Sequence, residues 1–563
     1  MARRTAFKRH DVNVVKVIGH LLKNQDYFSK MYVQLTNDRQ LKTPEEAFAL
    51  IIEAHLTKAQ YEIFHFDCPS RYPPYNVIAG AKKTCAPPVE FIEGSASKIK
   101  VELQALMNHT ASRILQVIRQ DVTDYLDSHD LDCAELVLLS SWGMDGSTGY
   151  SQFNHSLPEG SIDDSDVFAA TLTPIQLYVH SDGKHILWHN PTPQSIRFCR
   201  PIMLQFIKES REIILKTKHD LEKEMCELTP LKIDLPGDKF VLIDFNFVLS
   251  MIDGKVLTYI TGSSSMQNCP ICGATPNIMN SIEKLEEGFT ANEDTLYYGI
   301  SPLHAWIRFF ECLLHISYRM EIKQWRVTKD LKLNYLKRKK MVLEALHKAF
   351  GFRADQPRSG GKGTSTTGNI CRKAFSNPEL LSSVLGIEKE LIERFRNILI
   401  AINCQEAINP EIFDEYCKDT YRFYLEHYEW YKIPATLHKV LAHAGDIILH
   451  SPAPLGVLAE EAAECQHKHL KLFRSHFARK RSREANLMDV FLRALHESDP
   501  YLSSMWVSKK HTKKVCSSYP TVVRSFMVFE DSESDTSSNI MNDLMDAVDE
   551  VDEDFEEDVV DED

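Results

Sequence analysis

Hydrophobic positions change their spacing along the chain, and each change predicts a different kind of structure. Up to about residue 95 the apolar residues recur mostly at helical spacing, and Thr43-Pro44-Glu45-Glu46 is typical of a helix start before 47–56. A turn rich in proline follows, then a short basic helix that ends near Cys85. Another helix is expected over 97–127.

From residue 133 the pattern is typical of strands. We expect strands over 135–141, 167–179 and 186–189, a long amphipathic helix over 202–226, and further strands over 240–251 and 256–260. Asp145 follows the first of these strands, and Asp253 follows the 240–251 strand. Strands, then a helix, then a strand, with an acid at two strand ends, is the order of an RNase H-like core. The pattern therefore predicts an α/β core, a mixed sheet flanked by helices.

Beyond residue 272 the spacing is helical again. The best helices are expected over 303–320, 335–349, 387–402 and 410–431, and a Gly/Ser/Thr-rich segment over 358–369 predicts a flexible loop. A last core helix over about 454–478 carries Glu460, Glu461 and Glu464. The helical stretch thus interrupts the α/β core as a large insertion.

These patterns together predict a division of the chain into seven parts. They are a helical N-terminal region (1–95), a helical connector (96–132), the first part of the core (133–268), a helical insertion (269–443), the final core helix (444–478), a helical C-terminal region (479–529) and an acidic tail (530–563).

The charge of the chain is unevenly distributed. The formal net charge is −14, but 17 acidic residues and no Lys or Arg lie in 530–563. Removing those 17 from the 79 acidic residues leaves 62, against 65 Lys and Arg, so the rest of the chain is close to neutral. The tail is expected to be disordered. Basic clusters at 337–340, 479–483 and 509–514 are typical of solvated helix faces as well as of nucleic-acid contacts.

Composition also excludes some classes of protein. With 563 residues and 43% hydrophobic content, the chain is expected to be globular. Its longest apolar run, 240–252, is too short for a membrane span and contains Asp244 and Asn246, so no membrane partner is expected. The basic N-terminus lacks the apolar core of a secretion signal. Thirteen scattered cysteines are typical of reduced thiols in the cytosol or nucleus.

Cys269-Pro-Ile-Cys272 and His438-Lys-Val-Leu-Ala-His443 are the most informative motifs. Either pair alone is weak, but together two thiolates and two imidazoles complete a tetrahedral zinc site that leaves no position for water. Tying a loop of about 165 residues costs roughly 4 to 5 kcal/mol of chain entropy. Structural zinc contributes about 10 to 16 kcal/mol, so we expect one structural Zn²⁺.

The acids at the strand ends predict a different metal chemistry. Phosphodiester cleavage with two Mg²⁺ (or Mn²⁺) ions requires converging carboxylates, and two strand-end aspartates plus an acid from a later helix supply them. The residues alone leave two choices open. Asp244 competes with Asp253, and Glu460 and Glu461 compete with Glu464.

Two segments stand out, Ser250-Met-Ile-Asp253-Gly-Lys-Val256 and Cys269-Pro-Ile-Cys272-Gly-Ala-Thr-Pro-Asn-Ile-Met279-Asn280. In sequence and order they resemble Transib-family DNA transposases, which are related to the catalytic subunit of the V(D)J recombinase. The resemblance covers roughly residues 50–505. Further similar segments lie at 56–61, 72–85, 301–308, 368–373, 438–443 and 498–503.

The resemblance implies the site residues. The catalytic acids, which also hold the Mg²⁺ ions, would be Asp145, Asp253 and Glu464. His467 stands where the family pattern has Asn, so either His467 replaces that Asn or the register is shifted by a turn in favour of Glu460. The resemblance also places three residues beside DNA and two near the active site; these are Asn369, Arg372 and Lys373, and His304 and Trp306.

The resemblance also implies an activity. A nuclear homodimer would bind terminal inverted repeats through its N-terminal region, nick the DNA, form hairpins on the flanking DNA and join the excised ends to a target. Two alternatives stay open. One is a domesticated relative that binds DNA without cutting it, and the other is a zinc-stabilised transcriptional scaffold.

Overall fold

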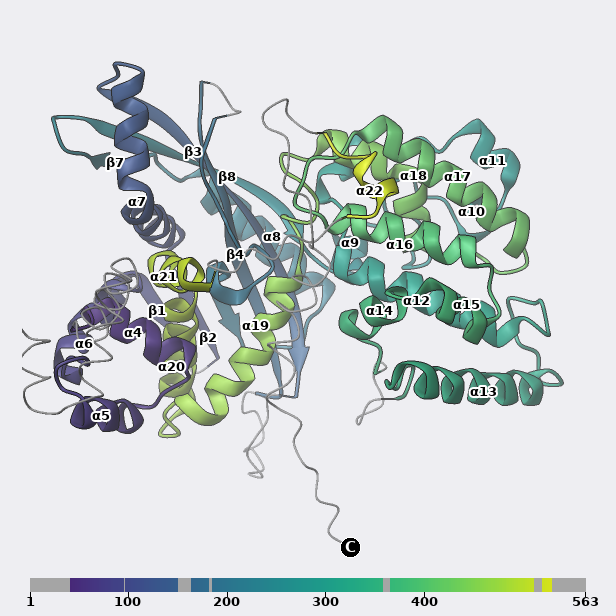
Figure 1. Cartoon of the computed structure of the whole chain (residues 1–563), viewed down its shortest axis with the longest axis horizontal. Helices are drawn as coiled ribbons and strands as arrows, with labels where there is room; N and C mark the ends of the chain where they lie inside the picture. The colour runs from purple at the N-terminus through teal and green to yellow at the C-terminus, as the bar shows by residue number, and fades with distance from the viewer. Residues whose placement is uncertain are drawn as a thin grey trace, which may run out of the picture.

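A mixed sheet forms the centre of the protein (Figure 1). The computed structural model describes residues 41–95, 97–149, 164–181, 185–357, 365–510 and 519–528. The predicted acidic tail, the first 40 residues of the N-terminal region and most of the predicted Gly/Ser/Thr loop lie outside the described residues. A small helical unit and a large helical lobe lie on opposite sides of the sheet (Figure 1).

The eight strands are ordered β1-β2-β6-β4-β3-β8-β7, with β5 paired to β4. Among these pairs β3 and β8 are parallel, and the others are antiparallel. The long central strand β3 is buried at every position from 136 to 144, as expected where helices cover both faces of a sheet. The bounds are Ile92–Gly94 (β1), Lys98–Val101 (β2), Cys133–Thr148 (β3), Asp166–Val179 (β4), Ile186–His189 (β5), Arg200–Gln205 (β6), Leu231–Asp234 (β7) and Phe240–Met251 (β8).

The register of β3 and β8 aligns two of the predicted acids. The last parallel pair is Gly143 opposite Met251, and Asp145 and Asp253 each lie two residues further along. The strands approach so closely here that a Cβ on residue 143 would lie 1.7 Å from the Met251 carbonyl oxygen. Only glycine permits this close approach of the two strands. Because the strands are parallel and in this register, Asp145 and Asp253 lie at the same edge of the sheet.

Two predicted elements around these strands are wrong. The 256–260 segment is not a strand but part of helix α9 (Gly254–Ile260), because the Asp253 carboxylate accepts a hydrogen bond from the Val256 N–H at 2.7 Å and caps the helix. The 202–226 segment is not one helix. Its apolar start belongs to strand β6, and α8 (Arg211–Cys226) begins only after Ser210, which caps it.

The remaining strand predictions agree well with the structure. The 186–189 and 240–251 strands are β5 and β8, and 167–179 lies within β4. The 135–141 strand is confirmed but continues to Thr148, so Asp145 lies inside β3. The 97–127 helix is α7 (Leu103–Ser128), whose predicted first residues instead form β2.

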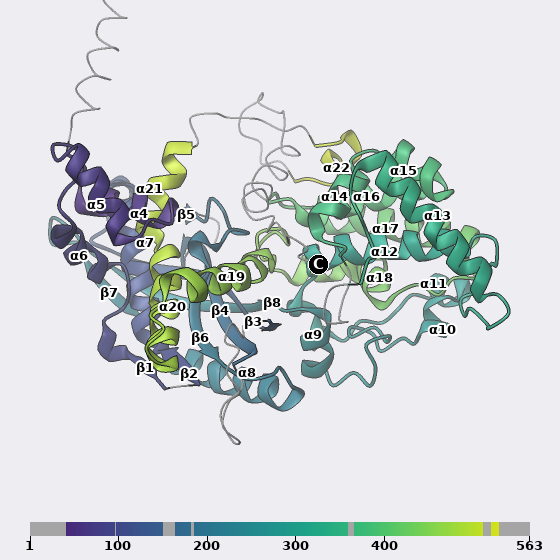
Figure 2. The same ribbon diagram turned by 90° about the horizontal axis from the view of Figure 1, so that it is seen from below.

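Helix α19 (Glu461–Leu472) packs against β3 and runs across the sheet between α20 (Arg483–Glu497) and the helical lobe (Figure 2). The single helix predicted over 454–478 is shorter than expected, since it begins at Glu461 and continues as a π-helical turn over Phe473–Phe477. α19 carries Glu464 toward the sheet edge that bears Asp145.

The helical lobe has its own hydrophobic core, built around aromatic residues such as Phe309, Phe395 and Tyr424. The sheet and its covering helices form a separate core. The helices of the helical lobe are α10 (Pro276–Met279), α11 (Ile282–Glu287), α12 (Pro302–Arg319), α13 (Lys332–Phe350), α14 (Gly368–Phe375), α15 (Pro378–Leu385), α16 (Lys389–Asn403), α17 (Pro410–Tyr428), α18 (Ala435–His450) and α22 (Thr521–Arg524). The predicted boundary between 443 and 444 falls inside α18.

The N-terminal unit combines helices from both ends of the described chain. Thr43 caps α4 through a capping box with Glu46, as the motif at 43–46 predicts. The helices are α4 (Pro44–Glu53), α5 (Lys58–Asp67), α6 (Tyr75–Thr84), α20 (Arg483–Glu497) and α21 (Pro500–Lys510).

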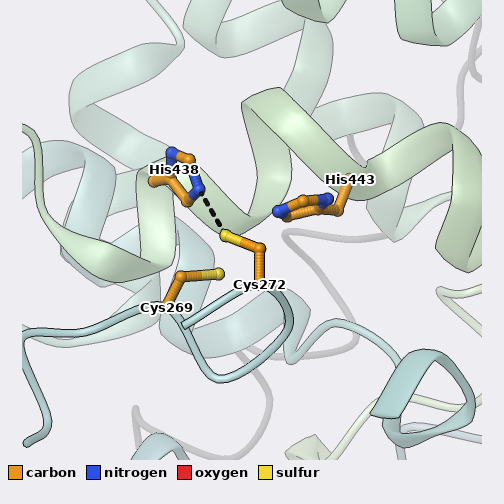
Figure 3. A group of neighbouring side chains, drawn as sticks. All are labelled: Cys269, Cys272, His438 and His443. Carbon is orange, nitrogen blue, oxygen red and sulfur yellow. Dashed lines mark hydrogen bonds between the residues drawn. The ribbon is translucent and has the colours of Figure 1, made fainter. Parts of the chain in front are cut away.

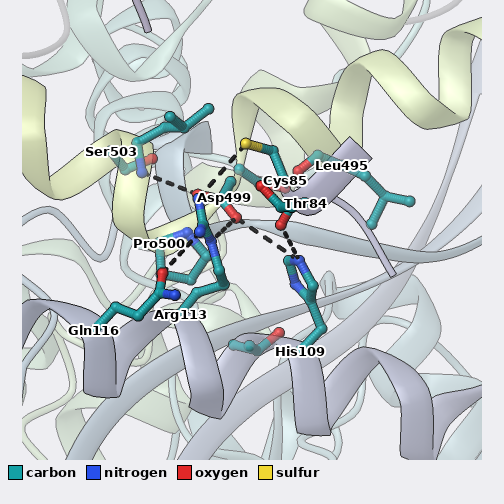
Figure 4. Close-up of polar contacts among 12 residues, drawn as sticks. Thr84, Cys85, His109, Arg113, Gln116, Leu495, Asp499, Pro500 and Ser503 are labelled. Carbon is teal, nitrogen blue, oxygen red and sulfur yellow. Dashed lines mark hydrogen bonds and ion pairs between the residues drawn. The ribbon is translucent and has the colours of Figure 1, made fainter. Parts of the chain in front are cut away.

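A buried polar network fastens this unit to the sheet (Figure 4). Arg113 of α7 donates to both carboxylate oxygens of Asp499, at 2.8 and 2.9 Å, and Asp499 also accepts from the Leu502 N–H at the start of α21. Arg200 of β6 donates to the Leu495 carbonyl and to His109 Nδ1. Burial lowers the pKa of His109 to about 3, so the ring is neutral and accepts this bond. Among the described residues, no helix is both long and apolar enough to cross a bilayer.

Candidate functional site

The four residues predicted to bind zinc come together (Figure 3). Cys269 and Cys272 lie on the turn before α10, and His438 and His443 lie on α18. One ligand atom from each residue lies within 4.8 Å of the others. Cys269 and both histidines are fully buried in the core of the helical lobe.

Local backbone bonds shape the cysteine turn. The Gly273 N–H donates to the Cys269 carbonyl at 2.9 Å, and the Cys269 N–H donates to the Ala274 carbonyl at 2.9 Å. This tight turn directs the sulfur atoms of Cys269 and Cys272 toward α18 (Figure 3). A hydrogen bond from Cys269 is the main cause that lowers the pKa of Cys272 to about 2, while burial raises that of Cys269. One sulfur is therefore held as a thiolate, the form that binds metals.

Tyr421 of α17 orients the first histidine. Its hydroxyl donates to the Met279 carbonyl at 2.7 Å and accepts from His438 Nδ1 at 2.7 Å. The His438 Nε2 atom, which lies 3.3 Å from Cys272 Sγ, is then left with its lone pair. His443 is buried, and within the described residues neither of its ring nitrogens makes a well-aligned hydrogen bond; Cys272 is the polar group on which it acts. A bound metal ion would satisfy one of them, so the four residues form a group that can hold a metal ion.

Asp145 lies on β3 at the edge of the sheet, with its side chain 20% exposed. Its carboxylate accepts from the Gly146 N–H at 2.8 Å and lies 3.4 Å from His467 Nε2. Burial opposes ionisation of Asp145, but the hydrogen bond and charge of His467 outweigh it and lower the pKa of the carboxyl. Asp145 is therefore ionised at neutral pH.

Asp253 and Glu464 have the opposite electrostatic setting. Burial is the main cause that raises the pKa of Asp253, and the charge of Asp145 adds to it. Burial also raises the pKa of Glu464 to about 7, again helped by Asp145, although the Glu464 side chain is 42% exposed at the surface of α19. Burial and the negative charge of Asp145 thus destabilise the ionised forms of Asp253 and Glu464. A divalent cation bound among the three carboxylates would remove this repulsion.

The three acids are neighbours but not a tight cluster. Their charges act on one another, yet Asp145, Asp253 and Glu464 are not among the described groups whose ligand atoms all lie within 4.8 Å. The carboxylate site is more open than the Cys/His group.

His304, at the start of α12, connects the two glutamates that compete for the third position. Its Nδ1 lies 3.0 Å from Glu460 and its Nε2 lies 4.0 Å from Glu464. Burial lowers the pKa of His304, but the hydrogen bond and charge of Glu460 and the charge of Glu464 raise it to about 9. Glu460 is buried and also accepts from Ser301 and the His304 N–H, so it faces α12. Glu464 is the glutamate that faces Asp145.

The three residues predicted to contact DNA all lie on α14, but their burial differs. Arg372 is buried, donates to Glu461 at 2.9 Å and lies over the Trp306 ring at 5.8 Å. Its guanidinium is therefore paired with an internal carboxylate, and its predicted place beside DNA stays a prediction. Asn369 is half-buried and Lys373 is exposed. Trp306 itself is buried against the rest of the lobe.

Glu209 is the neighbouring acid that the sequence analysis missed. It lies between β6 and α8, 3.0 Å from Lys255, and burial together with the charges of Asp253 and Asp145 raises its pKa. A Cβ on residue 146 would lie 2.6 Å from the Glu209 Cβ, so Gly146 leaves room for this side chain. The available signal was the pair Asp145-Gly146, whose glycine permits close approach.

No protein-family model matches this chain, and no curated protein matches it. The functional argument therefore depends on the residues and their geometry.

Proposed function

We propose that the protein is a DDE-type DNA transposase or recombinase, whose RNase H-like core cuts and joins DNA with two Mg²⁺ (or Mn²⁺) ions. One observation carries this proposal. Asp145 lies near the end of β3 and Asp253 follows the parallel strand β8, so both lie at the same sheet edge, and α19 brings Glu464 within range of the charge of Asp145. Carboxylate oxygens from three elements are the ligands that Mg²⁺ prefers at phosphodiester sites.

When bound, the two cations would activate water or a 3′-hydroxyl and stabilise the leaving oxygen. The proposed ligands differ in their protonation before a cation binds. Asp145 is already ionised, because His467 lowers the pKa of its carboxyl. Glu464 has a pKa of about 7 and gives up its proton as cations bind. His304, cationic and oriented by Glu460, balances negative charge beside Glu464.

The Cys/His group has a separate role in this proposal. Two thiolates and two imidazoles fit Zn²⁺ in a closed tetrahedral site, which supports a structural ion and leaves no position for a reacting water. The ion would fix the cysteine turn to α18 and so stabilise the core of the helical lobe.

DNA would reach the carboxylates past α14. Exposed Lys373 and half-buried Asn369 are the proposed contacts, and Arg372 acts as a positioning residue through Glu461. The reaction would proceed from binding of terminal inverted repeats, through nicks and hairpins, to joining of the excised ends. A homodimer in the nucleus is the proposed setting.

Cleavage of DNA tests this proposal directly. Duplexes selected from a randomised pool by the full-length protein would be incubated with Mg²⁺, and nicks and hairpins resolved on denaturing gels. Asp145→Asn is expected to remove both products. Asp244→Asn is the matched control, because Asp244 lies in the middle of β8, away from the sheet edge. Wild-type protein that binds the duplex and yields neither product would refute the enzyme.

A further inference from the structure

A second group of metal-ligating side chains lies where the N-terminal unit contacts α19. Ligand atoms of His55, His469 and Glu497 all lie within 4.8 Å of one another. His55 follows α4, His469 lies on α19, and Glu497 is the last residue of α20. Three segments far apart in the sequence therefore bring two imidazoles and a carboxylate to one place.

The polar atoms of this group are enclosed and poorly satisfied. His469 Nδ1 lies 3.4 Å from a Glu497 carboxylate oxygen, and the side chains of His469 and Glu497 are only 15% and 10% exposed. The Nδ1 atoms of His55 and His469 are buried; in the part of the chain that the structure describes, His55 Nδ1 has no hydrogen-bond partner, and the contact of His469 Nδ1 with Glu497 is not aligned as a hydrogen bond. Buried ring nitrogens normally have such a partner, so this arrangement calls for a ligand.

The backbone at His55 is strained. The Leu56 N–H donates to the Ile51 carbonyl and the His55 N–H to the Ile52 carbonyl, which is a Schellman motif at the end of α4. The residue at this position takes the left-handed conformation and is usually glycine, yet His55 adopts it with φ 47°. A histidine held in a glycine conformation, with its ring turned toward two other ligands, is an outlier of the kind that marks functional sites.

One nearby cation could oppose metal binding. The charge of Arg493 on α20 contributes to lowering the pKa of His55. The Arg493 guanidinium also donates to the Ile51 and Ile52 carbonyls and lies over the Phe473 and Phe477 rings. The carbonyls at the end of α4 carry partial negative charge, so much of the Arg493 charge is balanced there.

We propose that His55, His469 and Glu497 bind a divalent transition-metal cation, for which Zn²⁺ is the best fit. Two imidazoles and one carboxylate are a ligand set that zinc accepts, with a remaining position for water. Ligand atoms around one zinc lie roughly 3.3 Å apart, so the side chains close by up to about 1.5 Å on binding. The ion joins the end of α4 to α19, five residues from Glu464. Metal binding here does not depend on the proposed catalytic function.

Zinc content tests the site. The full-length protein would be equilibrated with micromolar Zn²⁺, separated from free metal and analysed for zinc per chain. His55→Gly suits the left-handed conformation, so this variant is expected to fold at least as well as the wild type and to hold one zinc fewer. His427→Gln, at an exposed position near the end of α17, is the matched control and is expected to hold as much zinc as the wild type.

Cobalt substitution shows which site is lost. Thiolate ligands give Co²⁺ an intense charge-transfer band, which the Cys/His group has and the His55 group lacks. We expect His55→Gly and His469→Gln to lose one metal each with this band unchanged. Equal zinc content in the wild type and His55→Gly would overturn the proposal. The measurement contains no DNA, so its failure is distinct from a failure to cleave.

Discussion

The Cys/His group and the carboxylate site differ in how completely the protein forms them. The first has four ligands within 4.8 Å of one another; three of them are buried, and Tyr421 orients His438. The carboxylates are looser and partly exposed, and the pKa values of Asp253 and Glu464 are raised by burial and by the charge of Asp145. A closed set suits an ion that stabilises the fold, and an open, mutually repelling set suits ions that bind with a substrate.

The buried glutamates beside the carboxylate site sharpen this contrast. Glu460 is bound by His304 and Ser301, and Glu461 is paired with Arg372. Burial opposes ionisation of Glu460, but its bonds to His304 and Ser301 lower its pKa. Burial and the charge of Glu460 instead raise the pKa of Glu461 to about 7 beside Arg372. Glu464, three residues further along α19, is the partly exposed glutamate that faces Asp145.

The largest expected effect is a loss of DNA cleavage in Glu464→Gln that Glu460→Gln does not share. Glu464→Gln removes a proposed metal ligand worth several kcal/mol in the transition state, so cleavage should fall on the order of 10³-fold. The free energy of unfolding should change by less than about 0.5 kcal/mol, since the side chain is partly exposed. Glu460→Gln should instead lower that free energy by about 1 to 3 kcal/mol, because it weakens charged, buried hydrogen bonds. Single-turnover cleavage and urea denaturation measure both.

The opposite result would assign the third catalytic acid to Glu460. If Glu460→Gln abolished cleavage with stability unchanged while Glu464→Gln stayed active, Glu460 would be the third acid.

A smaller effect is expected at the Cys/His group. Tyr421→Phe removes the hydroxyl that orients His438, and loss of such a partner lowers metal affinity by about 10- to 100-fold. Competition with a zinc chelator measures it. Tyr424→Phe is the matched control, because the Tyr424 hydroxyl donates to the Tyr431 carbonyl and contacts none of the four ligands. Equal affinities for the two variants would show that Tyr421 does not support the metal.

The carboxylate site should respond to pH. The pKa of Glu464 is about 7, so below that pH a proton occupies the carboxylate and Mg²⁺ must displace it. The Mg²⁺ concentration for half-maximal cleavage should therefore rise roughly fivefold between pH 7 and pH 6 and change little above pH 8. Cleavage rates over a Mg²⁺ series at each pH measure this. The same Mg²⁺ requirement at pH 6 and pH 8 would contradict the raised pKa.

The smallest expected effect concerns DNA at α14. Lys373→Ala removes one exposed charge, so affinity for duplex DNA should fall only several-fold and the slope of log affinity against log salt should shrink by about 1. Binding titrations at a series of salt concentrations measure both. Lys418→Ala is the control, because Lys418 lies on α17 and pairs with Asp414. A Lys373→Ala slope equal to the wild-type slope would remove Lys373 from the DNA contacts.

The two sites were accessible from the sequence to different degrees. The Cys/His group could be predicted because each pair is local and four soft ligands make a complete set. The carboxylates required the sheet register, since the alignment of Asp145 with Asp253 depends on the pairing of β3 with β8. Glu209 was missed because the strand before it, β6, was interpreted as the start of a helix.

The misassigned elements have physical causes. Residues 256–260 are apolar and β-branched enough to favour a strand, but the Asp253 side chain caps a helix there. The pairing of Arg372 with Glu461 could not be predicted locally, because tertiary packing alone brings the two residues together, and the predicted place of Arg372 beside DNA stays a prediction. Local patterns thus located the elements, whereas pairings between distant segments decided which charges reach the surface.

Selective removal of each metal tests the division between the two sites most directly. Helical circular dichroism and DNA cleavage would be measured on the same full-length protein after chelation of zinc and, separately, after removal of Mg²⁺. We predict that zinc chelation lowers the helical signal and stops cleavage even in excess Mg²⁺, because structural zinc contributes about 10 to 16 kcal/mol. Removal of Mg²⁺ should stop cleavage and leave the helical signal unchanged. Zinc chelation that changes neither the helical signal nor cleavage would contradict the account.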